Sequence, residues 1–218
     1  MSLLANLTER DFFKILIALA VYVTSITASN VLGLKLMPFL FDTNLSVAVF
    51  SFPVVFIMLD VIGEVYGKRV SRMFFIAGLV TILLFTAYTV ISLVAPFSDK
   101  SLWVKDGYNA VFGISLRVAL ASVTAFAIAE HQDILSFFFF RRKLGEKNFW
   151  LRSNLSNLWS QLLDTVIFML IAFYGVYPND VLITVIFTWW LYKVAMGVLY
   201  TPLSYVGIYL LRDYGKRA

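Results

Sequence analysis

Residues 153–165 read SNLSNLWSQLLDT, and the apolar segment 166–174 follows them directly. Four polar residues recur in and around this stretch at intervals of three or four: Asn154, Asn157, Gln161 and Asp164. On a helix this spacing places them on one stripe. If the helix crosses a membrane, such a stripe is tolerated only where it faces protein or a water-filled cavity. The organisation of the chain therefore depends on what this stripe faces.

The composition is that of an integral membrane protein. The 218 residues are 61% hydrophobic and only 14% charged, with a mean hydropathy of +0.84, well outside the range of soluble domains. Cysteine is absent and His131 is the single histidine, which excludes disulfides, thiolate chemistry and multi-histidine metal sites. We therefore expect no metal and no cofactor. The net charge of +5 is typical of basic membrane-flanking loops, so we expect no nucleic-acid partner.

Six runs are long and apolar enough to span a bilayer, which takes about 20 residues. They cover residues 13–34, 45–63, 73–95, 110–130, 157–177 and 181–211. The sequence thus predicts an all-α bundle of about six transmembrane helices in one domain, residues 1–218. The last run contains Pro202, so we expect a kink or break near residues 196–202.

The basic residues are distributed unevenly between the two sides of this bundle. One side carries Arg10, Lys14, Lys68, Arg69, Arg72, Arg141, Arg142, Lys143, Lys147, Arg152, Arg212, Lys216 and Arg217, and the other only Lys35, Lys100 and Lys105. Because lysine and arginine favour the cytoplasmic side, both termini are predicted to be cytoplasmic. In a bacterial cell this means the inner membrane.

Several ionisable residues fall at membrane depth, where each costs about 2.5–3.5 kcal/mol. At about 1.5 Å per residue, Asp164 and Lys193 both lie near the midplane, so they form the best-matched ion pair. Arg117 lies nearer the external face and is close enough to compete. Glu130 ends the fourth run, and we expect it at the aqueous boundary.

These residues have two interpretations. In the first they are structural, with ion pairs and interhelical hydrogen bonds holding the bundle together. Alternatively they line a ligand cavity, because they exceed what assembly requires. The polar set is Asn30, Asp60, Glu64, Asn154, Asn157, Gln161, Asp164 and Lys193. It suits a flat, hydrogen-bonding heterocycle, on which Phe52 would stack. The sequence has no nucleophile elbow and no phosphate-binding glycine loop, so we do not expect an enzyme.

The pattern of these residues resembles the queuosine precursor transporter family, also called the vitamin uptake transporter family. The resemblance rests on Ser29-Asn30 and Lys35; Phe52-Pro53, Asp60, Glu64 and Tyr66-Gly67; Arg117 and Ala121-Ser122; Gln132-Asp133; Ser153-Asn154, Ser160-Gln161 and Asp164-Thr165; and Lys193, Thr201-Pro202 and Tyr205. It implies uptake of a 7-deazaguanine, namely 7-cyano-7-deazaguanine, its aminomethyl form or queuine. It also implies a fold similar to the substrate-binding components of energy-coupling-factor transporters.

We expect the ligand near the midplane between the second, fifth and sixth spans, with Arg117 on the external rim. One carboxylate, Glu64 or Asp164, would accept two N–H bonds from the base, and Asn157 and Gln161 would address its other polar atoms. Two alternatives stay open: a subunit energised by an ATPase partner, or a structural subunit without a ligand. An exposed face of small residues would favour the first, and the candidates are Ala18, Ala28, Gly33, Ala119, Ala121 and Ala125. The oligomeric state is also open.

Overall fold

The computed structural model describes residues 8–33, 35–38, 44–113, 116–145, 147–176 and 178–212. Within them the α-helices are α1 (Glu9–Leu32), α2 (Phe52–Tyr66), α3 (Lys68–Val94), α4 (Lys105–Phe112), α5 (Leu116–Leu144), α6 (Phe149–Phe173) and α7 (Asn179–Leu211). Two 3₁₀ helices, η3 (Val47–Phe50) and η4 (Asp99–Val104), precede α2 and α4. A short antiparallel hairpin, β1 (Leu36–Pro38) with β2 (Asn44–Ser46), follows α1. Six helical segments are long and apolar enough to cross a membrane, which confirms the predicted all-α membrane fold.

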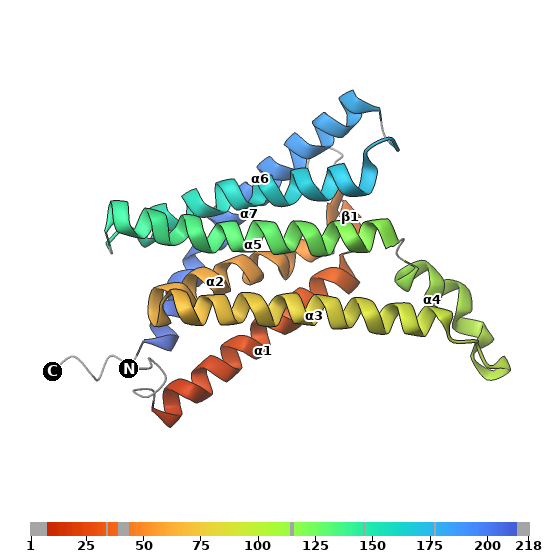
Figure 1. Ribbon diagram of the computed structural model, residues 1–218, viewed down its shortest axis with the longest axis horizontal. Helices are drawn as coiled ribbons and strands as arrows, with labels where there is room; N and C mark the ends of the chain where they lie inside the picture. Colours follow the sequence, from red (N-terminus) through yellow and green to blue (C-terminus); the bar gives the residue numbers. More distant parts are fainter. Residues whose placement is uncertain are drawn as a thin grey trace.

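The start of α1 and the end of α7 lie at the same end of the bundle, on the left in Figure 1. Lys14 Nζ donates to the backbone oxygen of Leu211 at 3.4 Å and joins the two helices there. We call this end of the bundle the terminal end. An even number of spans requires this arrangement, so the structure agrees with the prediction that both termini share one side of the membrane.

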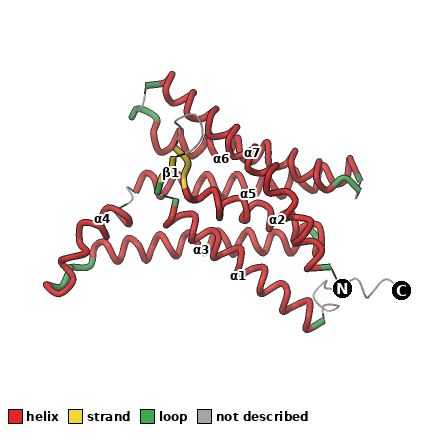
Figure 2. The backbone as a smooth tube through the Cα atoms, turned by 180° about the vertical axis from the view of Figure 1, so that it is seen from behind, coloured by secondary structure: helices red, strands yellow, loops and turns green. Residues whose placement is uncertain are grey.

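The helix α2 forms the centre of the bundle. It contacts α1, α3, α5, α6 and α7, and it lies in the middle in both backbone views (Figure 1, Figure 2). In the apolar stretch that contains α2, 61% of the residues are buried, whereas in that of α7 only 6% are buried. Pro53 sits in its first turn, where a missing N–H costs no hydrogen bond. Gly67, with φ of 83°, turns the chain directly into α3.

Two hydrophobic clusters hold the helices together, and α2 contributes to both. One packs Leu59 and Ile62 of α2 against Tyr22 of α1, Phe74 of α3 and Ile134 of α5. The other packs Ile57 and Val61 of α2 against Phe137 of α5, Phe149 of α6 and Ile208 of α7. Side chains that α2 projects in every direction are therefore covered by protein.

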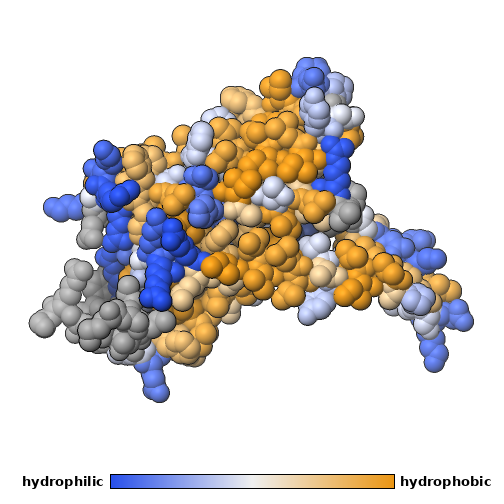
Figure 3. All heavy atoms as spheres, in the orientation of Figure 1, coloured by the Kyte–Doolittle hydropathy of each residue, from blue (hydrophilic) through white to orange (hydrophobic). Residues whose placement is uncertain are grey.

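The outer surface is apolar in the middle and polar at its ends. Figure 3 shows hydrophobic residues over the middle of this face and hydrophilic residues toward both ends of the long axis. Ile76 of α3, Ile183 and Leu199 of α7 are among the large exposed apolar side chains. An apolar belt between polar ends is what a bilayer requires. Trp103 of η4 is 86% exposed.

One sequence prediction about helix limits is wrong. The fourth span does not end at Glu130, because α5 continues to Leu144 and places Glu130 midway along a helix. The charge of Glu130 suggested that the span meets water there, but Glu130 is fully buried in the bundle. Near residues 196–202, where a kink or break was predicted, α7 continues through Pro202 without a break.

Candidate functional site

The polar stripe of α6 faces the interior of the bundle, as a stripe at membrane depth must. Its buried polar residues are Arg152, Ser153, Ser156, Asn157, Ser160, Gln161, Asp164 and Thr165. Asn154, at the edge of the stripe, is half-buried and contacts Thr201 of α7, with Nδ2 to Oγ1 at 3.2 Å. The helix therefore presents a continuous polar surface to α2, α5 and α7.

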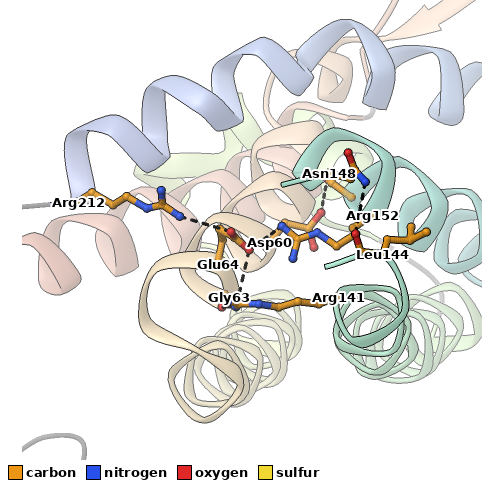
Figure 4. Close-up of polar contacts among 9 residues, drawn as sticks. Asp60, Gly63, Glu64, Arg141, Leu144, Asn148, Arg152 and Arg212 are labelled. Atoms are coloured by element: carbon orange, nitrogen blue, oxygen red, sulfur yellow. Dashed lines mark hydrogen bonds and ion pairs between the residues drawn. The ribbon is translucent and has the colours of Figure 1, made fainter. Parts of the chain in front are cut away.

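At the terminal end the stripe meets a group of arginines around one carboxylate. Glu64 of α2 pairs with Arg152 Nη2 at 3.0 Å, with Arg212 Nη2 at 3.4 Å and with Arg141 Nη1 at 3.7 Å (Figure 4). Arg152 is fully buried, and its guanidinium lies over the rings of Phe137 and Phe149. We call Glu64 with these three arginines the arginine cluster. It joins α2 to α5, α6 and the end of α7.

One helical turn farther into the bundle, serine hydroxyl groups donate hydrogen bonds to one oxygen of each of two more carboxylates. Ser153 Oγ donates to Asp60 Oδ2, and Asn157 Nδ2 donates to Ser153 Oγ at 3.5 Å. Ser160 Oγ donates to Asp133 Oδ1 of α5 at 2.9 Å. These bonds fix α6 against α2 on one side and against α5 on the other.

Beyond them lies a group of buried oxygen atoms that accept no hydrogen bond from any described residue. They are Glu130 Oε1 and Oε2, Asp133 Oδ2, Asn157 Oδ1 and Gln161 Oε1. We call Glu130, Asp133, Asn157 and Gln161 the acceptor cluster. Buried polar groups are nearly always paired, and burying them unpaired is costly. Several buried oxygens without a hydrogen-bonding partner are suited to a ligand that brings donors.

Toward the opposite end the predicted ion pair closes the polar region. Lys193 Nζ donates to Asp164 Oδ2 at 2.6 Å, which confirms the pairing expected from depth. The same ammonium lies 5.3 Å from the centre of the Phe52 ring, a cation–π distance. Asp164, Lys193 and Phe52 are thus brought together from α6, α7 and α2.

Two predicted site residues lie apart from this group. Arg117 donates from Nε to the backbone oxygen of Ile171 and from Nη2 to that of Tyr174, each at 2.6 Å. It therefore caps the end of α6. Asn30 donates to the Ile26 carbonyl of its own helix at 2.9 Å. The neighbouring Ser29 joins Ser51, just before α2, at 2.8 Å.

The sequence interpretation missed three contributors, namely Glu130, Asp133 and Arg152. Glu130 and Asp133 are three residues apart and share a face with the buried Ala125, Phe126 and Ala129. Extending the fourth span through the phenylalanine run 137–140 would have placed both carboxylates at depth. No comparable local signal identifies Arg152, because its partner Glu64 is distant in sequence.

A surface groove borders the arginine cluster, since Arg141 is one of its lining residues. It has a volume of about 830 Å³ and is lined by residues that include Lys68, Phe138, Arg142 and Trp159. It contains no member of the acceptor cluster. We therefore build the candidate site on buried polar contacts rather than on this groove.

Comparison with known proteins gives a consistent set of relatives. A family model described as "putative vitamin uptake transporter" matches residues 46–207. A protein of Bacillus subtilis named "probable queuosine precursor transporter" is 32% identical over 154 residues, 69% of this chain and 66% of the relative. The "queuosine precursor transporter" of Escherichia coli is 30% identical over 150 residues, 68% of this chain and 64% of the relative. No solved structure matches the chain.

Proposed function

The chain belongs to the vitamin uptake transporter family, and we propose that it carries a queuosine precursor, a base of the 7-deazaguanine type, across the inner membrane. The names of its two relatives support this cargo. The cargo is 7-cyano-7-deazaguanine, 7-aminomethyl-7-deazaguanine or queuine.

The observation that carries the proposal is the acceptor cluster. A guanine-type base presents a ring N–H and an amino group on one edge, so it can donate to oxygens that no described residue satisfies. Hydrogen bonds from these groups would satisfy some of the oxygens of Glu130, Asp133, Asn157 and Gln161 that no described residue satisfies. A base without these donors would leave the oxygens buried and unpaired.

We place the base between α2, α5, α6 and α7. Asp60 and Asn157 would lie on its terminal side, and the Phe52 ring with the Asp164–Lys193 pair on the opposite side. The proposed site retains the other predicted residues, Asn30, Glu64, Arg117 and Asn154, as surrounding groups. Glu64 and Asp164 already hold cations, whereas Glu130 forms no ion pair with a described residue. We therefore add Glu130 and Asp133 as the carboxyl groups nearest the base.

We further propose that the protein works without a partner. The small residues that would form an exposed docking face are largely internal, since Ala18, Ala121 and Ala125 are buried. Ala121 and Ala125 lie on the face of α5 that is buried in the bundle. The terminal end would face the cytoplasm, because it carries the arginine cluster and the basic run 141–143.

A thermal-shift panel on the purified protein tests the cargo. The three deazaguanines should raise the melting temperature in proportion to their affinity. Adenine, which lacks the N1–H and the 2-amino group, should not. Failure of all three deazaguanines to stabilise the protein would contradict the proposed cargo.

A further inference from the structure

Glu130 differs from every other buried carboxylate of the described chain in having no partner. Its side chain is 0% exposed and lies midway along α5. Neither carboxyl oxygen accepts a hydrogen bond, and the residue forms no ion pair among the described residues. An ionised carboxylate cannot be kept in such surroundings without compensation, and it becomes neutral by holding a proton.

The groups around Glu130 supply no compensating positive charge. The carboxylates that act on it electrostatically are Asp133 of its own helix, Asp164 of α6 and Asp60 of α2. On α1, the buried Tyr22 is the ionisable residue that interacts electrostatically with Glu130. The three aspartates are all carboxylates, so none of them compensates an ionised Glu130.

The cations of the adjacent helices are occupied or distant. Lys193 of α7 is bound by Asp164, and Arg152 of α6 by Glu64. The cations of α3, Lys68, Arg69 and Arg72, lie in its first turns at the terminal end. Farther along, α3 presents Gly78, which has no side chain, to the ring of Tyr22. His131 is exposed and its ring lies 6.0 Å from that of Phe75.

We propose that Glu130 is a proton-binding site that couples base uptake to proton entry. This rests on the proposed function for its cargo. A protonated carboxyl group has one O–H donor and one carbonyl acceptor. The lactam edge of a guanine-type base has one N–H donor and one carbonyl acceptor. The two edges match, with the base N–H donating to the carboxyl oxygen and the carboxyl O–H donating to the base carbonyl. The base therefore binds the protonated form, and the proton and base enter together.

The polar residues toward the terminal end give the proton an exit. Asp133 is three residues closer to that end on α5 and is contacted by Ser160. Asp133 and Asp60 act on each other electrostatically, and Asp60 accepts from Ser153. After release to the cytoplasmic side, the ionised Glu130 would no longer offer the donor that binds the base carbonyl.

The substitution Glu130→Gln separates proton holding from base binding. A carboxamide keeps one carbonyl acceptor and an N–H donor, so it mimics the protonated acid but exchanges no proton. Wild-type affinity for 7-cyano-7-deazaguanine should fall as the pH rises above the point where Glu130 loses its proton, by up to about tenfold per pH unit. Glu130→Gln should bind at the low-pH affinity throughout. Asp106→Asn, an exposed carboxylate far from the site, is the matched control and should retain the wild-type dependence.

Transport and spectroscopy complete the test. In liposomes, an acidic exterior should drive accumulation of 7-cyano-7-deazaguanine by the wild-type protein, with one proton entering per base. Glu130→Gln should exchange internal for external base but should not accumulate it against a gradient. Independently of any base, the infrared spectrum of the wild-type protein at neutral pH should contain a protonated-carboxyl band that Glu130→Gln lacks.

Three results would overturn the inference: an ionised Glu130 in the wild-type spectrum, wild-type base entry without proton entry, or gradient-driven accumulation by Glu130→Gln. The second needs no variant, so it decides the matter even if Glu130→Gln does not fold. If the carboxyl band is present but no deazaguanine enters under any condition, the proposed cargo and its coupling fail while the proton-binding site stands.

Discussion

Glu64 and Glu130 are both buried glutamates on inward faces of central helices, and their surroundings are opposite. Glu64 is 7% exposed and is surrounded by Arg141, Arg152 and Arg212. Glu130 is 0% exposed and has no partner among the described residues. Burial alone therefore says little about the role of a carboxyl group. The compensated glutamate is suited to holding helices together, and the uncompensated one to binding something that is absent.

The largest effect on stability is expected from substituting Glu64, the glutamate that is paired with arginines. Glu64→Gln removes the charge that three arginines share, including the buried Arg152 at 3.0 Å. Breaking one side of a buried pair costs about 3–5 kcal/mol. The free energy of unfolding in detergent should fall by that amount. A loss no greater than that of the exposed control Asp106→Asn would show that the arginine cluster does not hold the helices.

The next effect concerns the ion pair at the other end of the polar region. Asp164→Asn keeps the shape of the side chain but removes the charge that holds Lys193 at 2.6 Å. If Asp164 helps to bind the base, affinity for 7-cyano-7-deazaguanine should fall by about 1.5–3 kcal/mol. Equilibrium binding to the folded variant measures this. A less stable variant with unchanged affinity would assign Asp164 a structural role only.

A smaller effect is expected in the acceptor cluster itself. Gln161→Leu removes a buried oxygen that no described residue satisfies. Binding should weaken by about 0.5–1.5 kcal/mol, the range for one neutral hydrogen bond. Stability should not fall, because an unpaired polar group is replaced by an apolar one. The opposite result, lower stability with full affinity, would place Gln161 in the structural framework instead.

The smallest effect on the stability of the protein is expected from substituting Glu130. Glu130→Gln exchanges one neutral buried group for another if Glu130 holds a proton. The free energy of unfolding at neutral pH should then change by less than about 1 kcal/mol, since no charge pair is broken. Comparison with Glu64→Gln in the same detergent checks this. Equal losses at the two positions would remove the distinction between them.

Much of the fold follows from the sequence, because apolar runs of span length require helices in a bilayer. The inward direction of the α6 stripe and the pairing of Asp164 with Lys193 were also predictable, since unpaired polar groups at depth are so costly. Depth along two helices was enough to match that pair.

The rest depends on contacts between distant segments. Charged residues occur both where a span meets water and in buried sites, and the sequence alone does not separate the two cases. Glu130 and Asp133 were therefore predicted to lie at the end of a span. Arg152 was counted among the loop cations, and only the packing of α2 against α6 shows that Glu64 lies beside it. The partners of Arg117 were not predictable either, because the end of α6 and the residue after it supply the two carbonyls that it binds. The similarity to energy-coupling-factor components stays a prediction.

The central claim is that buried acceptors in the middle of the bundle bind the donor edge of a guanine-type base. The most direct test changes the ligand and leaves the protein intact. The affinity of the purified wild-type protein should be measured for 7-cyano-7-deazaguanine and for its N1-methyl derivative, which lacks the ring N–H. We predict saturable binding of the parent base, and binding of the derivative at least about tenfold weaker, since one hydrogen bond to a charged or acidic group is lost. Equal affinities, or no binding of the parent base, would contradict the account.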